Sequence, residues 1–578
     1  MSALQKYITR YIPIIGTLQN YNRDALKGDM NAGITVAIML VPQGMAYAVL
    51  AGMPPVYGLY ASLVPLLLYA ILGTSRQLAV GPVAMVSLLV IAGVSELADV
   101  GSDRFIQLAI MTALGVGVFQ LLMGVFRMGF MVNFLSHPVL SGFTSAAAVI
   151  IGASQLRNLL GLDLPRTNQV HEILIGAVQR ITEIDPLTAI IGIGSVAAIM
   201  LIKRWKKTFP SALVVVVIGT VVTALFNLHT QGVAIVGEVP KGLPSFMSPG
   251  FDLDDFQALI PIILVIALVS YMESIAVAKA IANKRGYKVD ANQELIALGG
   301  ANLGGAFFQS FPTTGGFSRT AVNDQAGAAT TVASVISAVL IGFTVLFLTP
   351  LFYYLPGAVL AAIIMVAVAG LFDYKEMVYL WKTDKKDLAM LAVTFLATLV
   401  LGIEEGIAIG VVISLILVIY TSTKPHHAEL GRLGASNNFR NITRYHEAVV
   451  EKDILIYRFD SSLFFANVEH FRETVQERIA SHGDDLKVVI LDASAISSVD
   501  STGIHMLQEF IKDLRARGID LYIASAIGPV RDRLKTCGIT DIMGDHSFFF
   551  DVGDAIRCYK QMEEFEADGT HSPLQTNC

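Results

Sequence analysis

The sequence predicts a polytopic α-helical membrane protein that carries a soluble α/β domain at its C-terminus. Hydrophobic residues make up 54% of the 578 residues and charged residues only 15%, whereas soluble proteins carry about one quarter charged residues. The mean hydropathy is +0.61. Long apolar runs dominate up to Thr423, and from Lys424 onward the chain reads like an ordinary soluble domain. We therefore expect a cytoplasmic N-terminal segment at 1–27, a transmembrane domain at 28–423, a linker at 424–441, the α/β domain at 442–565 and a disordered tail at 566–578.

A membrane-spanning helix needs about 20 mostly apolar residues. Windows of this size give fourteen candidate spans, at 30–50, 55–72, 80–97, 105–126, 138–156, 187–202, 211–226, 258–282, 291–308, 318–335, 336–354, 357–373, 387–402 and 404–422. An even number of spans places both termini on the same side of the membrane.

Lysine and arginine in the short loops predict which side that is. With a cytoplasmic N-terminus, the inner loops hold most of these residues, including the run Lys203, Arg204, Lys206 and Lys207. The outer loops hold only Arg104, Arg157, Arg166, Arg180 and Lys241. Because positive charge concentrates in cytoplasmic loops, we expect both termini in the cytoplasm. The first 27 residues show no removable signal peptide, and we expect a bacterial inner membrane as the location.

Two segments interrupt otherwise apolar stretches with Gly, Pro and polar residues, at Gly73–Met85 and Phe308–Asn323. Non-helical backbone at membrane depth is tolerated only where protein buries it or a cavity wets it. Each break follows the second apolar segment of its half, which predicts a seven-plus-seven inverted repeat. Each break then presents a half-helix N-terminus near the midplane, where free N–H groups and the helix dipole favour an anion.

The C-terminal part predicts a small layered α/β domain. Short apolar strands at 454–459, 488–491 and 521–524 alternate with amphipathic helices at 468–479, 503–517 and 530–537. The three cysteines, Cys537, Cys558 and Cys578, lack metal-ligand spacing and suit a reducing compartment. No HExxH, GxSxG or P-loop pattern occurs. We therefore expect neither an enzyme nor a primary pump, and no cofactor, metal or nucleic-acid partner.

Four stretches resemble sulfate permeases and related anion exchangers, the SulP family. They are VPQGMAYAVLAGMPPVYGLY (Val41–Tyr60), GTSRQLAVGPVAM (Gly73–Met85), SHPVLSGFTSAAAVIIGASQL (Ser136–Leu156) and PTTGGFSRTAVN (Pro312–Asn323). The stretch LDASAISSVDSTGIHML (Leu491–Leu507) is similar to STAS domains, named for sulfate transporters and anti-sigma-factor antagonists.

The resemblance implies core and gate subdomains, a homodimer, and an anion site between the facing ends of the third and tenth helices. The eighth helix is most similar to plant-type and bacterial sulfate carriers, which are held to be proton-coupled. Sodium-coupled bicarbonate carriers of the family tend to have an Asp and a following Thr where this chain has Glu273 and Val277. The expected activity is therefore proton-coupled sulfate uptake.

Two charged residues lie in apolar surroundings at the predicted site. Glu273 sits within a predicted span, where an unpaired charge costs roughly 2.5–3.5 kcal/mol or more. It is interpreted either as a proton-binding group that couples transport or as a structural carboxylate paired with a basic residue such as Arg319. Arg319 follows the Gly315–Gly316 break, and either neutralises the anion or holds its counter-charge.

The remaining site residues offer hydrogen bonds without charge. Ser318 lies at the predicted start of the tenth helix. It is interpreted either as an anion ligand or as an N-cap of this helix. Gln43 and Tyr47 lie four residues apart on one helix face. They are interpreted either as anion ligands or as residues that form hydrogen bonds between helices. The predicted substrate site comprises Gln43, Tyr47, Val83, Ala84, Gly316, Phe317, Ser318 and Arg319, with Val83 and Ala84 acting through their backbone.

In the tail, Asp500-Ser501-Thr502-Gly503 resembles the motif phosphorylated in anti-sigma-factor antagonists. Phosphate on Ser501 or Thr502 would lie at a helix N-terminus, and a packing or docking role for a cytoplasmic partner is the alternative. Bicarbonate uptake, dicarboxylate import and anion exchange remain alternatives within transport. A membrane-anchored signalling scaffold is the alternative from a different class.

Overall fold

The computed structural model describes residues 11–19, 21–130, 136–164, 170–205, 209–250, 252–434 and 436–567. It divides into two compact units, Met1–Ser414 and Leu415–Cys578, which are each described by themselves. The predicted tail at 566–578 lies outside the described residues, except that the last helix reaches Ala567.

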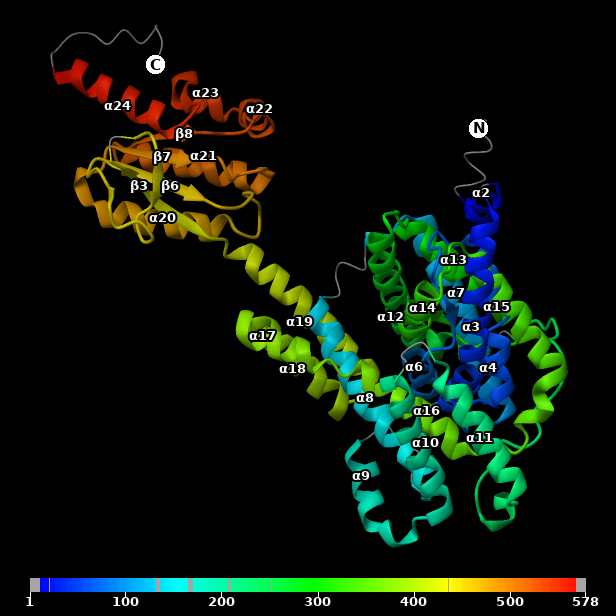
Figure 1. The fold of residues 1–578 in the computed structure, drawn as a ribbon. Coiled ribbons are helices and arrows are strands. Elements are labelled where there is room, and N and C mark those ends of the chain that lie inside the picture. Colours follow the sequence, from blue (N-terminus) through cyan, green and yellow to red (C-terminus); the bar gives the residue numbers. More distant parts are fainter. Residues whose placement is uncertain are drawn as a thin grey trace. The chain divides into compact units, whose positions relative to one another are not determined.

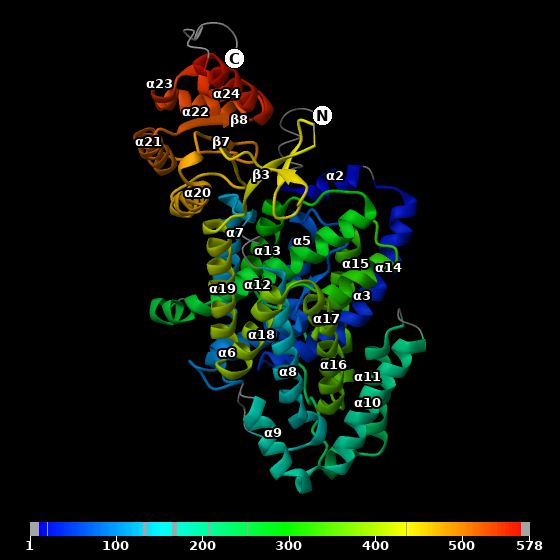
Figure 2. The same cartoon turned by 90° about the vertical axis from the view of Figure 1, so that its left-hand side faces the viewer.

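The first unit is a bundle of helices that run largely alongside one another (Figures 1 and 2). Its helices are α2 (Pro13–Gln19), α3 (Arg23–Leu50), α4 (Pro55–Ala61), α5 (Val64–Leu72), α6 (Ala84–Val94), α7 (Asp103–Val125), α8 (His137–Leu160), α9 (Val170–Gln179), α10 (Pro186–Trp205), α11 (Ser211–Leu225), α12 (Leu253–Arg285), α13 (Ala291–Ala306), α14 (Phe317–Gln325), α15 (Val332–Phe343), α16 (Gly357–Val368), α17 (Tyr374–Thr383) and α18 (Lys385–Val400). The helix α19 (Ile403–Thr423) leads into the second unit.

Eight stretches of the described residues are long and apolar enough to cross a membrane, and α6, α11 and part of α19 are shorter apolar helices. Each of the fourteen predicted spans overlaps at least one helix, which is consistent with the predicted count without confirming it. Several boundaries differ from the prediction, and the start of α3 and the extent of α14 differ most. The helix α3 begins at Arg23, capped by the Asn22 side chain, which accepts a hydrogen bond from the Ala25 N–H at 2.8 Å.

The second difference concerns the predicted span at 318–335. The helix α14 ends at Gln325, and α15 begins only at Val332. Gly327 between them has φ +101°, a left-handed conformation that favours glycine and ends the helix. The tenth segment is therefore a half-helix of nine residues, like α6 with eleven.

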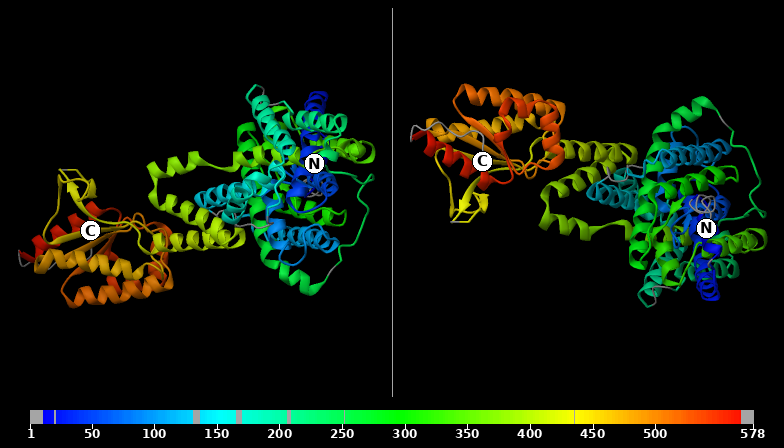
Figure 3. Two further views of the ribbon diagram at one scale, coloured as in Figure 1. Left: turned by 90° about the horizontal axis from the view of Figure 1, so that it is seen from below. Right: turned by 90° about the horizontal axis from the view of Figure 1, so that it is seen from above.

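The second unit is an α/β domain built on one sheet (Figure 3). The strands are β3 (His427–Leu433), β4 (Phe439–Asn441), β5 (Ala448–Val449), β6 (Ile454–Phe459), β7 (Val488–Asp492), β8 (Asp520–Ala524) and β9 (Phe548–Phe549). Their order is β4-β3-β6-β7-β8-β9, and β5 pairs with β3. The pairs from β6 to β9 are parallel, as expected where helices connect the strands.

Helices cover both faces of this sheet. One apolar cluster packs α20 (Val468–His482), α21 (Ser501–Ala516), α22 (Gly528–Thr536) and α23 (Ile539–Met543) on one face. A second cluster packs α24 (Val552–Ala567) on the other. The predicted linker at 424–441 is wrong from His427 onward, because β3 and β4 lie within it and belong to the sheet.

Candidate functional site

The two broken segments meet at the centre of the first unit. The strand β1 (Val80–Gly81) pairs antiparallel with β2 (Thr314–Gly315), with Val80 opposite Gly315. Each strand leads into a half-helix, because β1 is followed by α6 and β2 by α14. The antiparallel pairing makes the two half-helices leave the strand pair in opposite directions, with both N-termini turned toward it.

The first turns of both half-helices carry free backbone donors. The first intrahelical hydrogen bond of α6 runs from the Ser87 N–H to the Val83 carbonyl at 3.0 Å, and that of α14 from Thr320 to Gly316 at 3.0 Å. The N–H groups of the preceding helical residues therefore have no acceptor within their helices. Together with the positive ends of two helix dipoles, they form an environment that favours an anion.

A cavity of about 510 Å³ lies beside these helix ends. The half-helices, α3 and α12 line one side of it, and α10, α11 and α16 contribute to the rest. The structure brings together in its lining all nine residues predicted for anion binding and proton coupling: Gln43, Tyr47, Val83, Ala84, Glu273, Gly316, Phe317, Ser318 and Arg319.

Arg319 bridges the two half-helices from the first turn of α14. Its side chain is almost fully buried, and Nη1 donates a hydrogen bond to the Pro82 carbonyl just before α6. The guanidinium lies against Gly316, where a Cβ atom would stand 2.9 Å from Nη2. The buried Nε and Nη2 atoms have no hydrogen-bond partner among the described residues. Leaving buried donors unpaired is costly, so Nε and Nη2 are available to a hydrogen-bond acceptor in the cavity.

Glu273 projects into the same cavity from α12 but does not pair with Arg319. The Oε2 atom is buried without a hydrogen-bond partner in the described part of the chain. The interpretation of Glu273 as a structural carboxylate paired with Arg319 is therefore wrong for this conformation. Arg319 instead donates to Pro82. An intramembrane carboxylate without a partner is a candidate functional group.

The uncharged residues also face the cavity. Gln43 and Tyr47 lie one turn apart on α3, and both line the cavity. The alternative of Ser318 as an N-cap is wrong, because Gly316 occupies that position and Ser318 is the second helical residue. The Ser318 hydroxyl is exposed to the cavity instead.

A buried polar network fixes β2 against α12 next to Glu273. The Ser274 hydroxyl accepts a hydrogen bond from the Gly315 N–H at 2.8 Å and lies 2.6 Å from the Thr314 hydroxyl. The Asn302 side chain bonds both the N–H and the carbonyl of Thr313. Ser274 and Asn302 escaped the sequence analysis, because single Ser and Asn residues within apolar runs carry no distinctive pattern.

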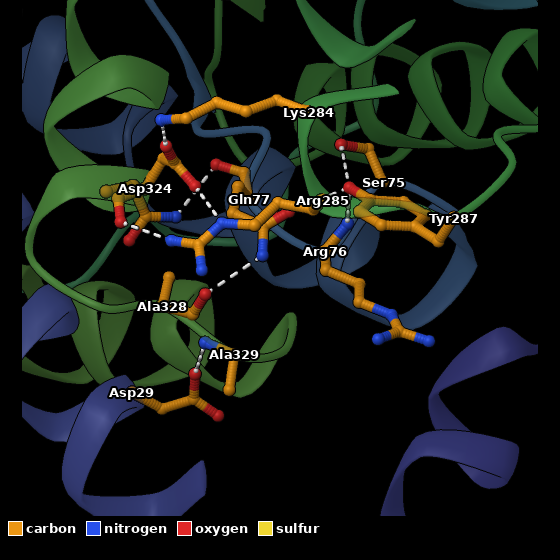
Figure 4. Close-up of polar contacts among 11 residues, drawn as sticks. Asp29, Ser75, Arg76, Gln77, Lys284, Arg285, Tyr287, Asp324, Ala328 and Ala329 are labelled. Atoms are coloured by element: carbon orange, nitrogen blue, oxygen red, sulfur yellow. Dashed lines mark hydrogen bonds and ion pairs between the residues drawn. The ribbon is translucent and has the colours of Figure 1, made fainter. Parts of the chain in front are cut away.

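A second polar cluster fixes the far end of α14 (Figure 4). The buried Asp324 carboxylate accepts from Lys284 Nζ at 2.7 Å and from Arg285 Nε at 2.6 Å. Both basic residues end α12. Close by, the Tyr287 hydroxyl donates to the Gln77 side chain at 2.7 Å. Contacts with α12 therefore hold α14 at both ends. Ser274 binds β2 just before the start of α14, and Lys284 and Arg285 bind Asp324 near its end.

One charged cavity residue was missed as a site residue. Lys203 on α10 lines the cavity together with Phe209–Ala212 at the α10–α11 connection. The sequence analysis used Lys203 only to orient the membrane domain. By that predicted orientation, this part of the cavity lies on the cytoplasmic side.

In the second unit, Ser501 and Thr502 are the first two residues of α21 and are both exposed. The Asp500 side chain caps this helix, because its Oδ1 accepts from the Gly503 N–H at 2.8 Å. The phosphorylation of either hydroxyl stays a prediction.

Fold and site together define a multi-pass membrane protein of the secondary-transporter type, with a binding cavity at the N-termini of broken helices. Comparison with family models gives the particular family. The sulfate permease family matches residues 26–394, and the STAS domain matches residues 445–555. The chain belongs to the sulfate permease family, whose members are transporters and not enzymes.

Known relatives agree with this assignment. The chain is 38% identical to the chloroplastic sulfate transporter 4.1 of Arabidopsis thaliana, over 98% of this chain and 85% of the relative. It is 33% identical to the high affinity sulfate transporter 2 of Stylosanthes hamata, over 95% of this chain and 86% of the relative.

The expected fold is confirmed by a solved relative. The structure of murine Solute Carrier 26 family member A9, an anion transporter in the inward-facing state, superposes with a TM-score of 0.90 at 27% identity, covering 97% of this chain and 96% of that chain. The transmembrane domain of the cyanobacterial bicarbonate transporter BicA has the same fold, with a TM-score of 0.59 at 22% identity, covering 68% of this chain and 98% of that one.

Proposed function

We propose that this protein takes up sulfate together with protons across a bacterial inner membrane. The observation that carries the proposal is the buried Arg319 guanidinium, which has unpaired donors beside two half-helix N-termini. The curated relatives named as sulfate transporters support the choice of anion.

In this proposal, the sulfate oxygens accept hydrogen bonds from Nε and Nη2 of Arg319. They also accept from the free N–H groups at the starts of α6 and α14. Gln43, Tyr47 and Ser318 add uncharged donors. An uncharged donor stabilises the dianion less than a cation does, which favours release as well as binding.

Glu273 supplies the coupling in this mechanism. An ionised carboxylate in the same cavity repels a dianion, because like charges in a weakly polar environment interact strongly. Protonation of Glu273 removes this repulsion, so the proton and the sulfate favour each other's binding. Such mutual stabilisation is a coupling free energy between two sites.

Movement of α3, α6, α12 and α14 as one core against α10 and α11 would carry the site between the two sides of the membrane. Ser274 on α12 binds β2, and Asp324 on α14 binds Lys284 on α12, which supports a core in which β2, α12 and α14 move together. Both groups of helices line the cavity, which supports this division.

The test is radiolabelled sulfate uptake into proteoliposomes, with and without an inward proton gradient. We expect accumulation that rises with the gradient. Uptake that is indifferent to pH but driven by sodium, or by an anion on the opposite side, would reject proton symport.

Other anions remain alternatives within transport. Bicarbonate uptake, dicarboxylate import and anion exchange each fit a site built largely from backbone N–H groups. Competition of labelled sulfate uptake by sulfate, bicarbonate, chloride and succinate discriminates among them, and we expect unlabelled sulfate to compete best. A membrane-anchored signalling scaffold would show no uptake of any of these anions.

We also propose cytoplasmic termini, a homodimer, and a cytoplasmic protein partner for the STAS domain. The lysine and arginine distribution supports the orientation, and the family resemblance supports the dimer. Reporter fusions at the C-terminus test the orientation, mass determination in detergent tests the dimer, and crosslinking in cells tests the partner. Periplasmic reporter activity, a monomeric mass or an absence of crosslinked partners would contradict the respective point.

A further inference from the structure

The STAS domain contains a second polar cavity, separate from the transport cavity. Its volume is about 310 Å³, which falls at the lower end of the range for small-molecule pockets. Three guanidinium groups and one carboxylate line it, from Arg440, Arg444, Arg458 and Asp460, together with His426 and Tyr445. All these residues belong to the second unit.

The single carboxylate is already engaged. Asp460 accepts hydrogen bonds from Arg458 Nε at 2.6 Å and Nη2 at 3.1 Å, and it contacts His426 Nδ1 at 2.6 Å. Burial raises the pKa of Asp460, but the hydrogen bonds from Arg458 and His426 outweigh it and hold this pKa below its usual value. Asp460 is therefore ionised and neutralises Arg458.

The other two guanidinium groups have no carboxylate partner in the described part of the chain. Arg440 Nη1 donates only to the carbonyl of neighbouring Phe439, at 3.2 Å. The turn after β4 places Arg444 beside it, and the Asn441 side chain fixes this turn by accepting from the Thr443 N–H at 2.8 Å. Two uncompensated positive charges at one concave site attract an anion.

We propose that Arg440 and Arg444 bind the phosphate of a phosphomonoester, carried either by a soluble metabolite or by the headgroup of an anionic lipid. Guanidinium groups match the geometry of phosphate oxygens and bind them with two parallel hydrogen bonds. Tyr445 offers a further hydroxyl at the rim. This site is independent of the anion that the membrane domain carries.

Two probes with the same phosphate group distinguish the sources. Binding of the purified full-length protein is measured for glycerol 3-phosphate in solution and for dioctanoyl phosphatidic acid in neutral-lipid nanodiscs. Binding of both with similar affinity supports a soluble ligand, and preference for phosphatidic acid supports a lipid headgroup. Binding of neither overturns the proposal.

The arginines are tested by Arg440→Gln combined with Arg444→Gln. We expect about tenfold or greater weakening of binding, because hydrogen bonds between charged groups are strong. The matched control is Arg517→Gln with Arg533→Gln, which removes the same charge from exposed positions outside the cavity and should leave binding unchanged. Arg440→Lys with Arg444→Lys keeps the charge and should bind better than the glutamine pair. Equal weakening in the pocket and control variants would overturn the proposal.

Discussion

The Arg319 guanidinium donates a hydrogen bond from Nη1 to the carbonyl of Pro82. This single contact ties the first turn of α14 to the segment that precedes α6, although 237 positions separate the two residues. Because the hydrogen bond from Nη1 to Pro82 fixes the plane of the guanidinium, the unpaired atoms Nε and Nη2 keep a defined direction. The same residue therefore positions the two half-helices and offers charge to an anion.

Arg319→Lys should weaken sulfate affinity about tenfold or more, because lysine keeps the charge but loses the planar set of donors. Sulfate binding to purified protein is the measurement. Arg104→Lys, in a largely exposed ion pair with Asp255, is the control and should bind like wild type. Wild-type affinity in Arg319→Lys would remove this residue from the site.

Two glycines beside Arg319 give a matched pair of variants. A Cβ atom at Gly316 would lie 2.9 Å from Nη2, whereas one at Gly81 would lie 3.5 Å away, an ordinary contact. Gly316→Ala should displace the guanidinium and lower sulfate affinity about tenfold, while Gly81→Ala should change it little. Equal affinities in the two variants would show that the guanidinium position does not matter for binding.

Glu273→Gln mimics the protonated carboxyl group permanently. We expect loss of uptake driven by a proton gradient, with sulfate counterflow in the absence of a gradient preserved. Both are measured with labelled sulfate in proteoliposomes. If pH-dependent accumulation persists in the variant, the coupling group lies elsewhere.

Asp324→Asn should destabilise the core, because Lys284 and Arg285 lose the charge of a buried carboxylate. We expect a loss on the order of 1–3 kcal/mol in the free energy of unfolding, measured as a lower melting temperature in detergent. Asp255→Asn, which removes the partner of the largely exposed Arg104, should cost at most about 1 kcal/mol. If the melting temperature of Asp324→Asn is no lower than that of Asp255→Asn, the ion pairs of Asp324 do not stabilise the core.

The STAS domain should lose stability as pH rises through the His482 transition. The side-chain hydrogen bond to Glu429 is the largest cause that raises the pKa of His482, and burial opposes it. The two side chains are 3.0 Å apart. A raised pKa in the folded state means that the stabilisation is complete below the unfolded value of about 6.5 and disappears as pH rises above the folded value. The difference in melting temperature between wild type and His482→Gln should therefore shrink as pH rises above about 6.5. A difference that does not change with pH would contradict this role of His482.

Much of this architecture is predictable from sequence because bilayer length and apolar composition constrain each span. The broken segments were recognisable from Gly and Pro at membrane depth, and their residues do meet in one cavity. The strand β3 was missed because HAELGRL mixes charged with apolar residues and contains no continuous apolar run. The pairing of Arg319 with Pro82 rather than Glu273 depends on tertiary geometry, which no local pattern encodes.

The central claim is that the anion lies between the starts of α6 and α14. Selenate has the shape and charge of sulfate, and its selenium scatters anomalously, so a crystal structure with selenate locates the anion directly. We predict an anomalous peak in the cavity between Val83 and Ser318, within hydrogen-bond distance of Nε or Nη2 of Arg319. A selenate peak only outside this cavity, in protein that binds selenate in solution, would contradict the account.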